Sequence, residues 1–141
     1  MDGSITVKIP STSYSYFSFI QDIFFDKSRP NYMNYAAIGC VVGHELSHGF
    51  DDQGRRFDAE GNLNNWWDDE TSAKYVEKTK CIIYQYGNYT EPSVNLPLNG
   101  INTQGENIAD NAGFKQAYRA YGKEIAFFCV FLKIPLFYHV N

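Results

Sequence analysis

The stretch that most constrains this chain is GHELSHG, residues 43–49, because it holds two of the three histidines, four residues apart. On an α-helix, positions i and i+4 lie on one face, so His44 and His48 can direct both imidazole rings at one ion. Zinc binds imidazole nitrogens at about 2.0–2.1 Å. Glu45 lies about 100° further round such a helix, where its carboxylate can take a proton from water held by a metal. The pattern therefore predicts a helix with two metal ligands and a general base.

The alternative interpretation of this motif is a solvated helix face on which two histidines occur together by chance. The surrounding sequence argues against it, because each glycine in a helix interior costs up to about 1 kcal/mol relative to alanine. Three glycines nevertheless stand here: Gly39, Gly43 and Gly49. With the apolar residues Val41, Val42 and Leu46, they favour a buried helix. Buried histidines and a buried glutamate need partners, and a metal ion supplies one.

A catalytic zinc site usually has three protein ligands, so a third is needed. His139 follows an apolar tail and has no supporting motif. The better candidate is GENIAD, residues 105–110, where Glu106 and Asp110 are one helical turn apart. We expect a second helix to present Glu106 to the metal and Asp110 to a ligand histidine, because such histidines commonly donate their other N–H to a carboxylate. A glutamate at a helix start is also favoured by the helix dipole, so GENIAD alone does not indicate a metal site. It does so in combination with the HExxH motif.

The wider patterns predict a mainly helical chain. We expect helices over residues 35–50, 68–86 and 105–121. Asn34 is the expected N-cap of the first helix. Residues 58–65 are expected to form a connector that turns at Gly61, and residues 87–104, with two prolines and two glycines, a loop.

Composition restricts the class of protein. The chain has 141 residues, 44% hydrophobic and 20% charged, which is typical of one globular domain or part of one. The formal net charge is −4 and no basic cluster occurs, which argues against a nucleic-acid partner. Three cysteines without a C-x-x-C pair give neither a closed disulfide set nor a thiolate zinc site.

The two ends carry no clear targeting signal. The first residues do not resemble a signal peptide. The apolar stretch at residues 125–132 is shorter than the roughly 20 residues that span a bilayer. We expect it to form a buried strand or a short core helix.

Two longer stretches, GHELSHGFDDQGRRFDAEGNLNNWW and LNGINTQGENIADNAGFKQAYRAY, resemble the neprilysin family of zinc endopeptidases, which includes the endothelin-converting enzymes. The resemblance divides the chain into a divergent segment (1–31), a catalytic core (32–121) and a divergent apolar tail (122–141). It implies part of a thermolysin-like catalytic lobe, with an HExxH helix, an ENxAD helix and little or no sheet.

The resemblance also implies roles for the motif residues. His44, His48 and Glu106 correspond to the ligands of one Zn²⁺ per chain. Glu45 corresponds to the general base, and Asp110 to the carboxylate that bonds a ligand histidine, expected to be His44. The implied activity is cleavage of peptides on the amino side of hydrophobic residues. The implied location is outside the cell, on a membrane-anchored or secreted ectodomain.

Several parts of the family pattern are missing from this sequence. The family has a large N-terminal helical domain, an anchor helix, a substrate-binding edge strand of the Asn-Ala-Tyr type, and a histidine and arginines downstream that contact the reacting substrate. Residues 1–19 and 122–141 contain no matching text. We therefore expect a fragment of a larger enzyme, with impaired activity and with the missing N-terminal domain as its natural partner. The alternative is a catalytically incompetent zinc-binding module. A third and less favoured interpretation is an interaction protein that binds no metal.

Two further residues fit the family. Cys81 matches a family cysteine whose partner lies near the usual C-terminus, beyond the resemblance. Asn88 begins the N-glycosylation sequon Asn88-Tyr89-Thr90, which lies where family members carry one. The sequon favours an extracellular parent protein.

Overall fold

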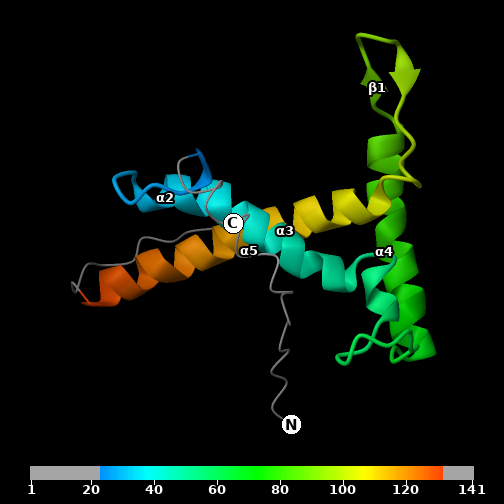
Figure 1. Cartoon of the computed structure of the whole chain (residues 1–141), viewed down its shortest axis with the longest axis horizontal. Helices are drawn as coiled ribbons and strands as arrows, with labels where there is room; N and C mark the ends of the chain where they lie inside the picture. The colour runs from blue at the N-terminus through cyan, green and yellow to red at the C-terminus, as the bar shows by residue number, and fades with distance from the viewer. Residues whose placement is uncertain (1–22, 132–141) are drawn as a thin grey trace.

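The computed structural model describes residues 23–131, with side chains up to residue 124. Over this part the chain is mainly helical, and its sheet consists of one two-stranded hairpin (Figure 1). The predicted fold class, helical with little or no sheet, is confirmed. None of the described helices is long and apolar enough to cross a bilayer. The expectations for residues 1–22 and 132–141 lie outside the described residues.

The first helical segment is continuous but changes its hydrogen-bonding pattern along its length. In chain order it comprises α2 (Asn31–Asn34), a π-helical turn (Tyr35–Gly39), α3 (Cys40–Ser47) and a 3-10 turn (His48–Phe50). Single π-helical turns inside α-helices occur frequently near functional sites. Here the π-helical turn directly precedes the helix that carries the HExxH motif.

The predicted N-cap at Asn34 is wrong. Asn34 has helical backbone angles, φ −67° and ψ −40°, and Pro30 occupies the N-cap position of α2. The Asn34 side chain instead bonds the backbone of Asp26, accepting its N–H at 3.0 Å and donating to its carbonyl at 2.9 Å. Its amide therefore holds an earlier turn of the chain rather than the free N–H groups of a helix start.

The second helix, α4 (Asp69–Gly87), has nearly the predicted bounds. Asp68 is its N-cap and accepts hydrogen bonds from the backbone N–H and the hydroxyl of Thr71, at 2.7 and 2.9 Å. These bonds lower the pKa of the Asp68 carboxyl. An N-capping aspartate satisfies a free N–H and complements the helix dipole, so Asp68 fixes the start of this helix.

The predicted loop after α4 contains the hairpin. Strands β1 (Thr90–Glu91) and β2 (Leu96–Pro97) pair antiparallel, with Thr90 opposite Pro97. Next comes α5 (Gln104–Phe131), which begins one residue before the predicted start and continues past the predicted end at residue 121. The helix includes most of the apolar stretch for which a strand or a short helix was expected.

The fold is held mainly by the crossing of α3 over α5 (Figure 1). Small residues meet along this crossing, and the backbones approach closely. A β-carbon added to Gly43 would lie 2.7 Å from the carbonyl oxygen of Gly113, and one added to Gly39 would lie 3.5 Å from Cβ of Ala117. Among the described side chains, the buried apolar ones are Ala109 and Ala117, both on α5.

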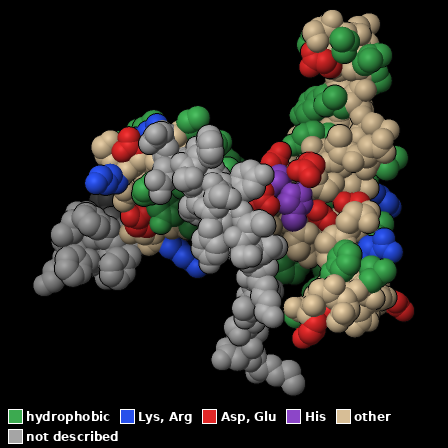
Figure 2. All heavy atoms as spheres, in the orientation of Figure 1, with side chains coloured by type: hydrophobic (Ala, Val, Ile, Leu, Met, Phe, Trp, Pro, Cys, Tyr) green, Lys and Arg blue, Asp and Glu red, His purple; other side chains and the backbone are tan. Residues whose placement is uncertain are grey.

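Large apolar side chains, by contrast, lie on the outside. Around α4 and the hairpin, Val76, Tyr84, Val94 and Leu96 are 46–74% exposed, and Figure 2 shows hydrophobic side chains on this part of the surface.

Candidate metal centre

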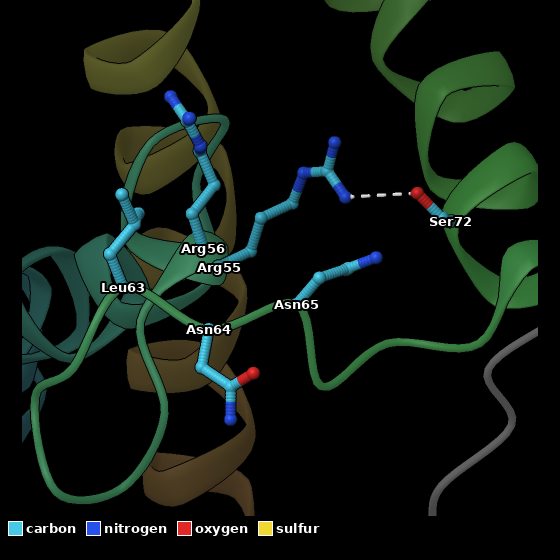
Figure 3. A pocket seen from close by; sticks show the side chains of 6 residues that line it. All are labelled: Arg55, Arg56, Leu63, Asn64, Asn65 and Ser72. Atoms are coloured by element: carbon cyan, nitrogen blue, oxygen red, sulfur yellow. Dashed lines mark hydrogen bonds between the residues drawn. The ribbon is translucent and has the colours of Figure 1, made fainter.

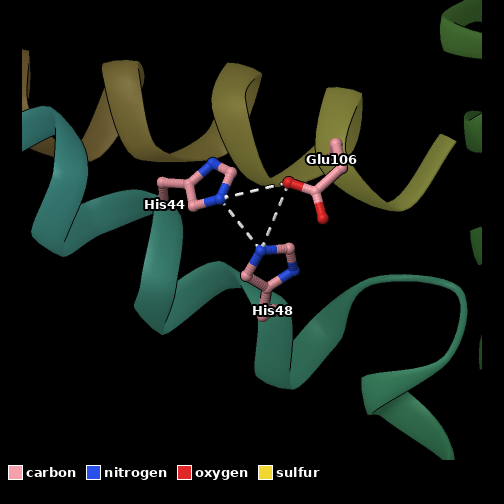
Figure 4. A group of neighbouring side chains, drawn as sticks. All are labelled: His44, His48 and Glu106. Carbon is pink, nitrogen blue, oxygen red and sulfur yellow. Dashed lines mark hydrogen bonds and ion pairs between the residues drawn. The ribbon is translucent and has the colours of Figure 1, made fainter. Parts of the chain in front are cut away.

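Three side chains from the two predicted motifs converge on one point (Figure 4). Nε2 of His44 lies 2.9 Å from Nε2 of His48, and Oε2 of Glu106 lies 3.4 Å from the former and 3.6 Å from the latter. A tetrahedral ion with ligands at about 2.0–2.1 Å separates its ligand atoms by about 3.3 Å. The residues present therefore fit a zinc ion with little movement.

The placement of this triangle follows from helix geometry. His44 lies on α3 and His48 begins the 3-10 turn after it, so both rings remain on one face. Glu106 lies in the first turn of α5. Its side chain is 69% exposed, so the centre opens to solvent on that side, as a site with a free coordination position requires.

Each histidine also has a carboxylate on its other ring nitrogen. Nδ1 of His44 lies 2.8 Å from Oδ1 of Asp110, and Nδ1 of His48 lies 2.8 Å from Oδ2 of Asp51. With both Nδ1 atoms protonated and donating, both Nε2 lone pairs face the shared point. The sequence predicted the contact of Asp110 with His44 but missed Asp51, which lies three residues after the motif in the pair Asp51-Asp52.

Asp51 is buried, at 7% exposure. Burial by itself raises its pKa, but hydrogen bonds from the N–H of Gly54, from His48 and from the N–H of Gln53 outweigh it and leave the pKa below its usual value. The hydrogen bond that His48 donates to Asp51, with the nearby negative charge of Glu106, raises the pKa of His48 against the opposing effect of burial. An ionised aspartate thus ties His48 to the turn that follows it.

The remaining predicted residues are Glu45, Asn88 and Cys81. Glu45 is exposed on α3, and its negative charge contributes to the raised pKa of His48. Asn88 is exposed at the C-cap of α4, and its amide donates to the carbonyl of Tyr84 at 2.9 Å. Cys81 is an exposed free cysteine.

The turn after the site is held against α4 by Arg55. The Arg55 guanidinium lies 4.7 Å from the ring centroid of Tyr75 and 5.7 Å from that of Trp67, and it donates to the Ser72 hydroxyl at 3.2 Å. Figure 3 shows Arg55 directed at Ser72 across a pocket of about 330 Å³. The backbone N–H of Arg55 donates to the backbone carbonyl of Asp51 at 3.3 Å. By fixing Arg55, the contacts with α4 therefore also support the segment that holds His48.

The fold and the His-His-Glu group define a helical chain with a candidate metal site. Comparison with known proteins places this chain in a family of peptidases. The family model described as Peptidase family M13 matches residues 14–128. The chain therefore belongs to peptidase family M13. Neprilysin-2 of Drosophila melanogaster is 63% identical over 102 residues, covering 72% of this chain and 13% of the relative. Human neprilysin is 50% identical over 103 residues, covering 72% of this chain and 14% of the relative.

Solved structures give the same result. A Mycobacterium tuberculosis zinc metalloprotease, ZMP1, in complex with an inhibitor has a TM-score of 0.74 at 38% identity, covering 78% of this chain and 18% of that chain. A Haemonchus galactose-containing glycoprotein complex has a TM-score of 0.70 at 36% identity, covering 79% and 17%. The chain spans about 13% of the length of Drosophila neprilysin-2 and about 14% of human neprilysin.

Proposed function

We propose that this chain carries the zinc-binding centre of a neprilysin-type metalloendopeptidase, with His44, His48 and Glu106 as ligands of one Zn²⁺. The observation that carries the proposal is the mutual spacing of their three ligand atoms, 2.9, 3.4 and 3.6 Å. Membership of a peptidase family supports peptides as the substrate class. When bound, zinc supplies a Lewis acid that lowers the pKa of water to about 7.

The side chains around the metal ligands have separate roles. Asp110 and Asp51 keep Nδ1 of each histidine protonated and leave Nε2 free to bind the metal. Glu45 takes the proton from the attacking water and passes it to the leaving amine, as a general base and then a general acid. Its position next to His44 and its solvent-exposed carboxylate are consistent with this role.

For the 141-residue chain by itself we expect zinc binding with weak peptide hydrolysis. Losing one preorganised donor to the developing oxyanion costs about 100- to 1000-fold in rate, and the sequence has no match to the family's donor histidine or substrate-binding arginines. The longer enzyme, with the family's N-terminal domain, is the form for which we propose full activity on peptides with a hydrophobic residue after the scissile bond. We also propose that it acts outside the cell and that Asn88 carries an N-linked glycan.

The test combines zinc analysis with a peptide assay. Purified chain should contain one zinc per molecule, and Glu106→Gln should weaken zinc affinity, whereas Glu45→Gln should retain zinc and abolish any hydrolysis of a fluorogenic peptide. No bound zinc would refute the metal centre. Hydrolysis unchanged by Glu45→Gln would remove Glu45 as the base.

The second candidate, a zinc-binding module without catalysis, gives the same metal content. It is distinguished by activity alone. Zinc at one per chain with no turnover, even in a longer enzyme carrying the family's other domains, would favour this second candidate.

A further inference from the structure

The backbones of α3 and α5 approach closely at Gly43 and Gly113, next to the metal centre. A β-carbon added to Gly113 would lie 2.8 Å from the carbonyl carbon of Gly43 and 2.9 Å from the carbonyl oxygen of Cys40, and would overlap the backbone nitrogen of His44. Neither Gly43 nor Gly113 has a positive φ. Glycine is therefore required here for space rather than for backbone conformation.

This contact has a fixed relation to the ligands. Gly43 directly precedes His44 on α3. On α5, Glu106, Asp110 and Gly113 follow one another at intervals of four and three residues, so they lie on one face. The α5 face that touches the backbone of α3 is thus the face that carries Glu106 to the two histidines and Asp110 to His44.

We infer that the Gly43–Gly113 contact is a positioning element of the metal centre, which sets the helix separation at which Glu106 reaches the point shared by His44 and His48. The inference rests on the proposed zinc site. A methyl group needs about 3.5 Å from neighbouring carbon atoms, so one added at either glycine would separate the helices by about 1 Å. Metal–ligand distances tolerate about 0.2 Å. Glu106 would then lie beyond ligand distance unless the helices tilted.

Two effects of a glycine-to-alanine change have opposite signs here. Alanine is the better helix former, so an effect on helix stability alone predicts zinc binding at least as tight as in the wild type. The close approach predicts weaker binding. The direction of the change in zinc affinity therefore distinguishes the two explanations.

The chain offers matched controls on both helices. Gly122, also on α5, has no atom within 4 Å of an added β-carbon, and Gly39, on the first helical segment, faces Ala117 at an ordinary 3.5 Å. Gly113→Ala and Gly43→Ala are to be compared with Gly122→Ala and Gly39→Ala. Zinc affinity is measured by competition with a chromophoric chelator, and helix content by circular dichroism.

We expect Gly113→Ala and Gly43→Ala to weaken zinc affinity at least about 10-fold at wild-type helix content, in the range of other changes that displace a ligand. The controls should stay within about twofold. A double-mutant cycle gives the sharper readout. If Gly113→Ala has already withdrawn Glu106 from the metal, then Glu106→Ala should cost much less affinity in the Gly113→Ala background than in the wild type.

Equal zinc affinity in Gly113→Ala and Gly122→Ala would overturn the inference, and so would full additivity of Gly113→Ala with Glu106→Ala. Loss of helix content in both glycine variants would also overturn it, because the contact would then serve folding rather than the placement of Glu106. Failure of the metal centre itself is a separate result, shown by wild-type protein that binds no zinc or is insensitive to Glu106→Ala.

Discussion

Nδ1 of His48 and Oδ2 of Asp51 lie 2.8 Å apart, which joins a proposed metal ligand to a buried carboxylate only three residues further along the chain. Asp51 also accepts the N–H groups of Gln53 and Gly54, at 2.8 and 2.6 Å. One side chain therefore orients the imidazole and closes the turn after the HExxH helix. A metal site organised in this way depends on residues that never touch the metal.

We expect Asp51→Ala to weaken zinc affinity by about 10- to 100-fold. Asp51→Asn should have a smaller effect, because the amide oxygen can still accept from the turn. The measurement is chelator competition. Asp52→Ala is the control, since the Asp52 carboxylate bonds the Gln53 side chain at 2.9 Å and does not bond His48. An equal loss in Asp52→Ala and Asp51→Ala would show that local charge, rather than the bond to His48, matters.

Asp110→Ala is expected to weaken zinc affinity by a similar factor, because it leaves Nδ1 of His44 without its acceptor. Asp110 and Asp51 support different histidines of one shared metal centre, so their effects on the free energy of zinc binding should be coupled rather than additive. The same titration on the double variant tests this. Zinc affinity unchanged by Asp110→Ala would exclude Asp110 from the support of the site.

The sequence predicted what depends on helical spacing. The convergence of His44 and His48 follows from their interval of four residues, and Asp110 follows from Glu106 in the same way. Asp51 could not be found by this reasoning, because it reaches His48 through a 3-10 turn and a change of chain direction. The division of the chain at residues 31 and 121 stays a prediction.

The helix α5 extends beyond the predicted end at residue 121. Gly122 does not stop it, because a single glycine costs a helix only about 1 kcal/mol. The helix continues, and Glu124 accepts a hydrogen bond from the side chain of Asn31, in α2, at 2.7 Å. A tertiary contact with a residue more than 90 positions away cannot be read from local sequence.

Arg55→Lys is expected to destabilise the fold by about 1 kcal/mol, because lysine keeps the charge but loses the flat guanidinium that contacts Tyr75 and Trp67. The measurement is the free energy of unfolding in urea. Arg56→Lys is the matched control: Arg56 is exposed, and its contact with Gln53 is long, at 3.4 Å. Equal effects of the two changes would show that the aromatic contacts of Arg55 contribute nothing specific.

The Tyr75 hydroxyl gives a pH-dependent prediction. Burial raises the pKa of Tyr75 to about 12 from an ordinary 10.0, against the opposing effect of Arg55. The folded state holds this proton more tightly than the unfolded state, so the contribution to stability is full below pH 10 and is lost as pH rises toward 12. Tyr75→Phe should therefore lose less stability than the wild type across this interval.

Phenolate absorbance checks the same prediction directly. The wild-type titration minus that of Tyr75→Phe should have its midpoint near pH 12. Tyr84→Phe, which removes a 74% exposed phenol from the same helix, controls for the loss of one chromophore. A difference curve centred near pH 10 would mean that Tyr75 is not buried in solution.

The glycine contact between α3 and α5 makes the mutational response of this region one-sided. In an ordinary core, side chains can be shortened, and the usual damage is a cavity. Gly43 and Gly113 have no side chain to shorten, so every substitution at either position adds atoms where the added β-carbon already lies within 3 Å of the opposite backbone. Substitutions at these two positions can therefore destabilise the contact only by overpacking it. Substitutions on the outer faces of α3 and α5 should therefore be tolerated, whereas even the smallest substitution at Gly43 or Gly113 should disrupt the contact between the two helices.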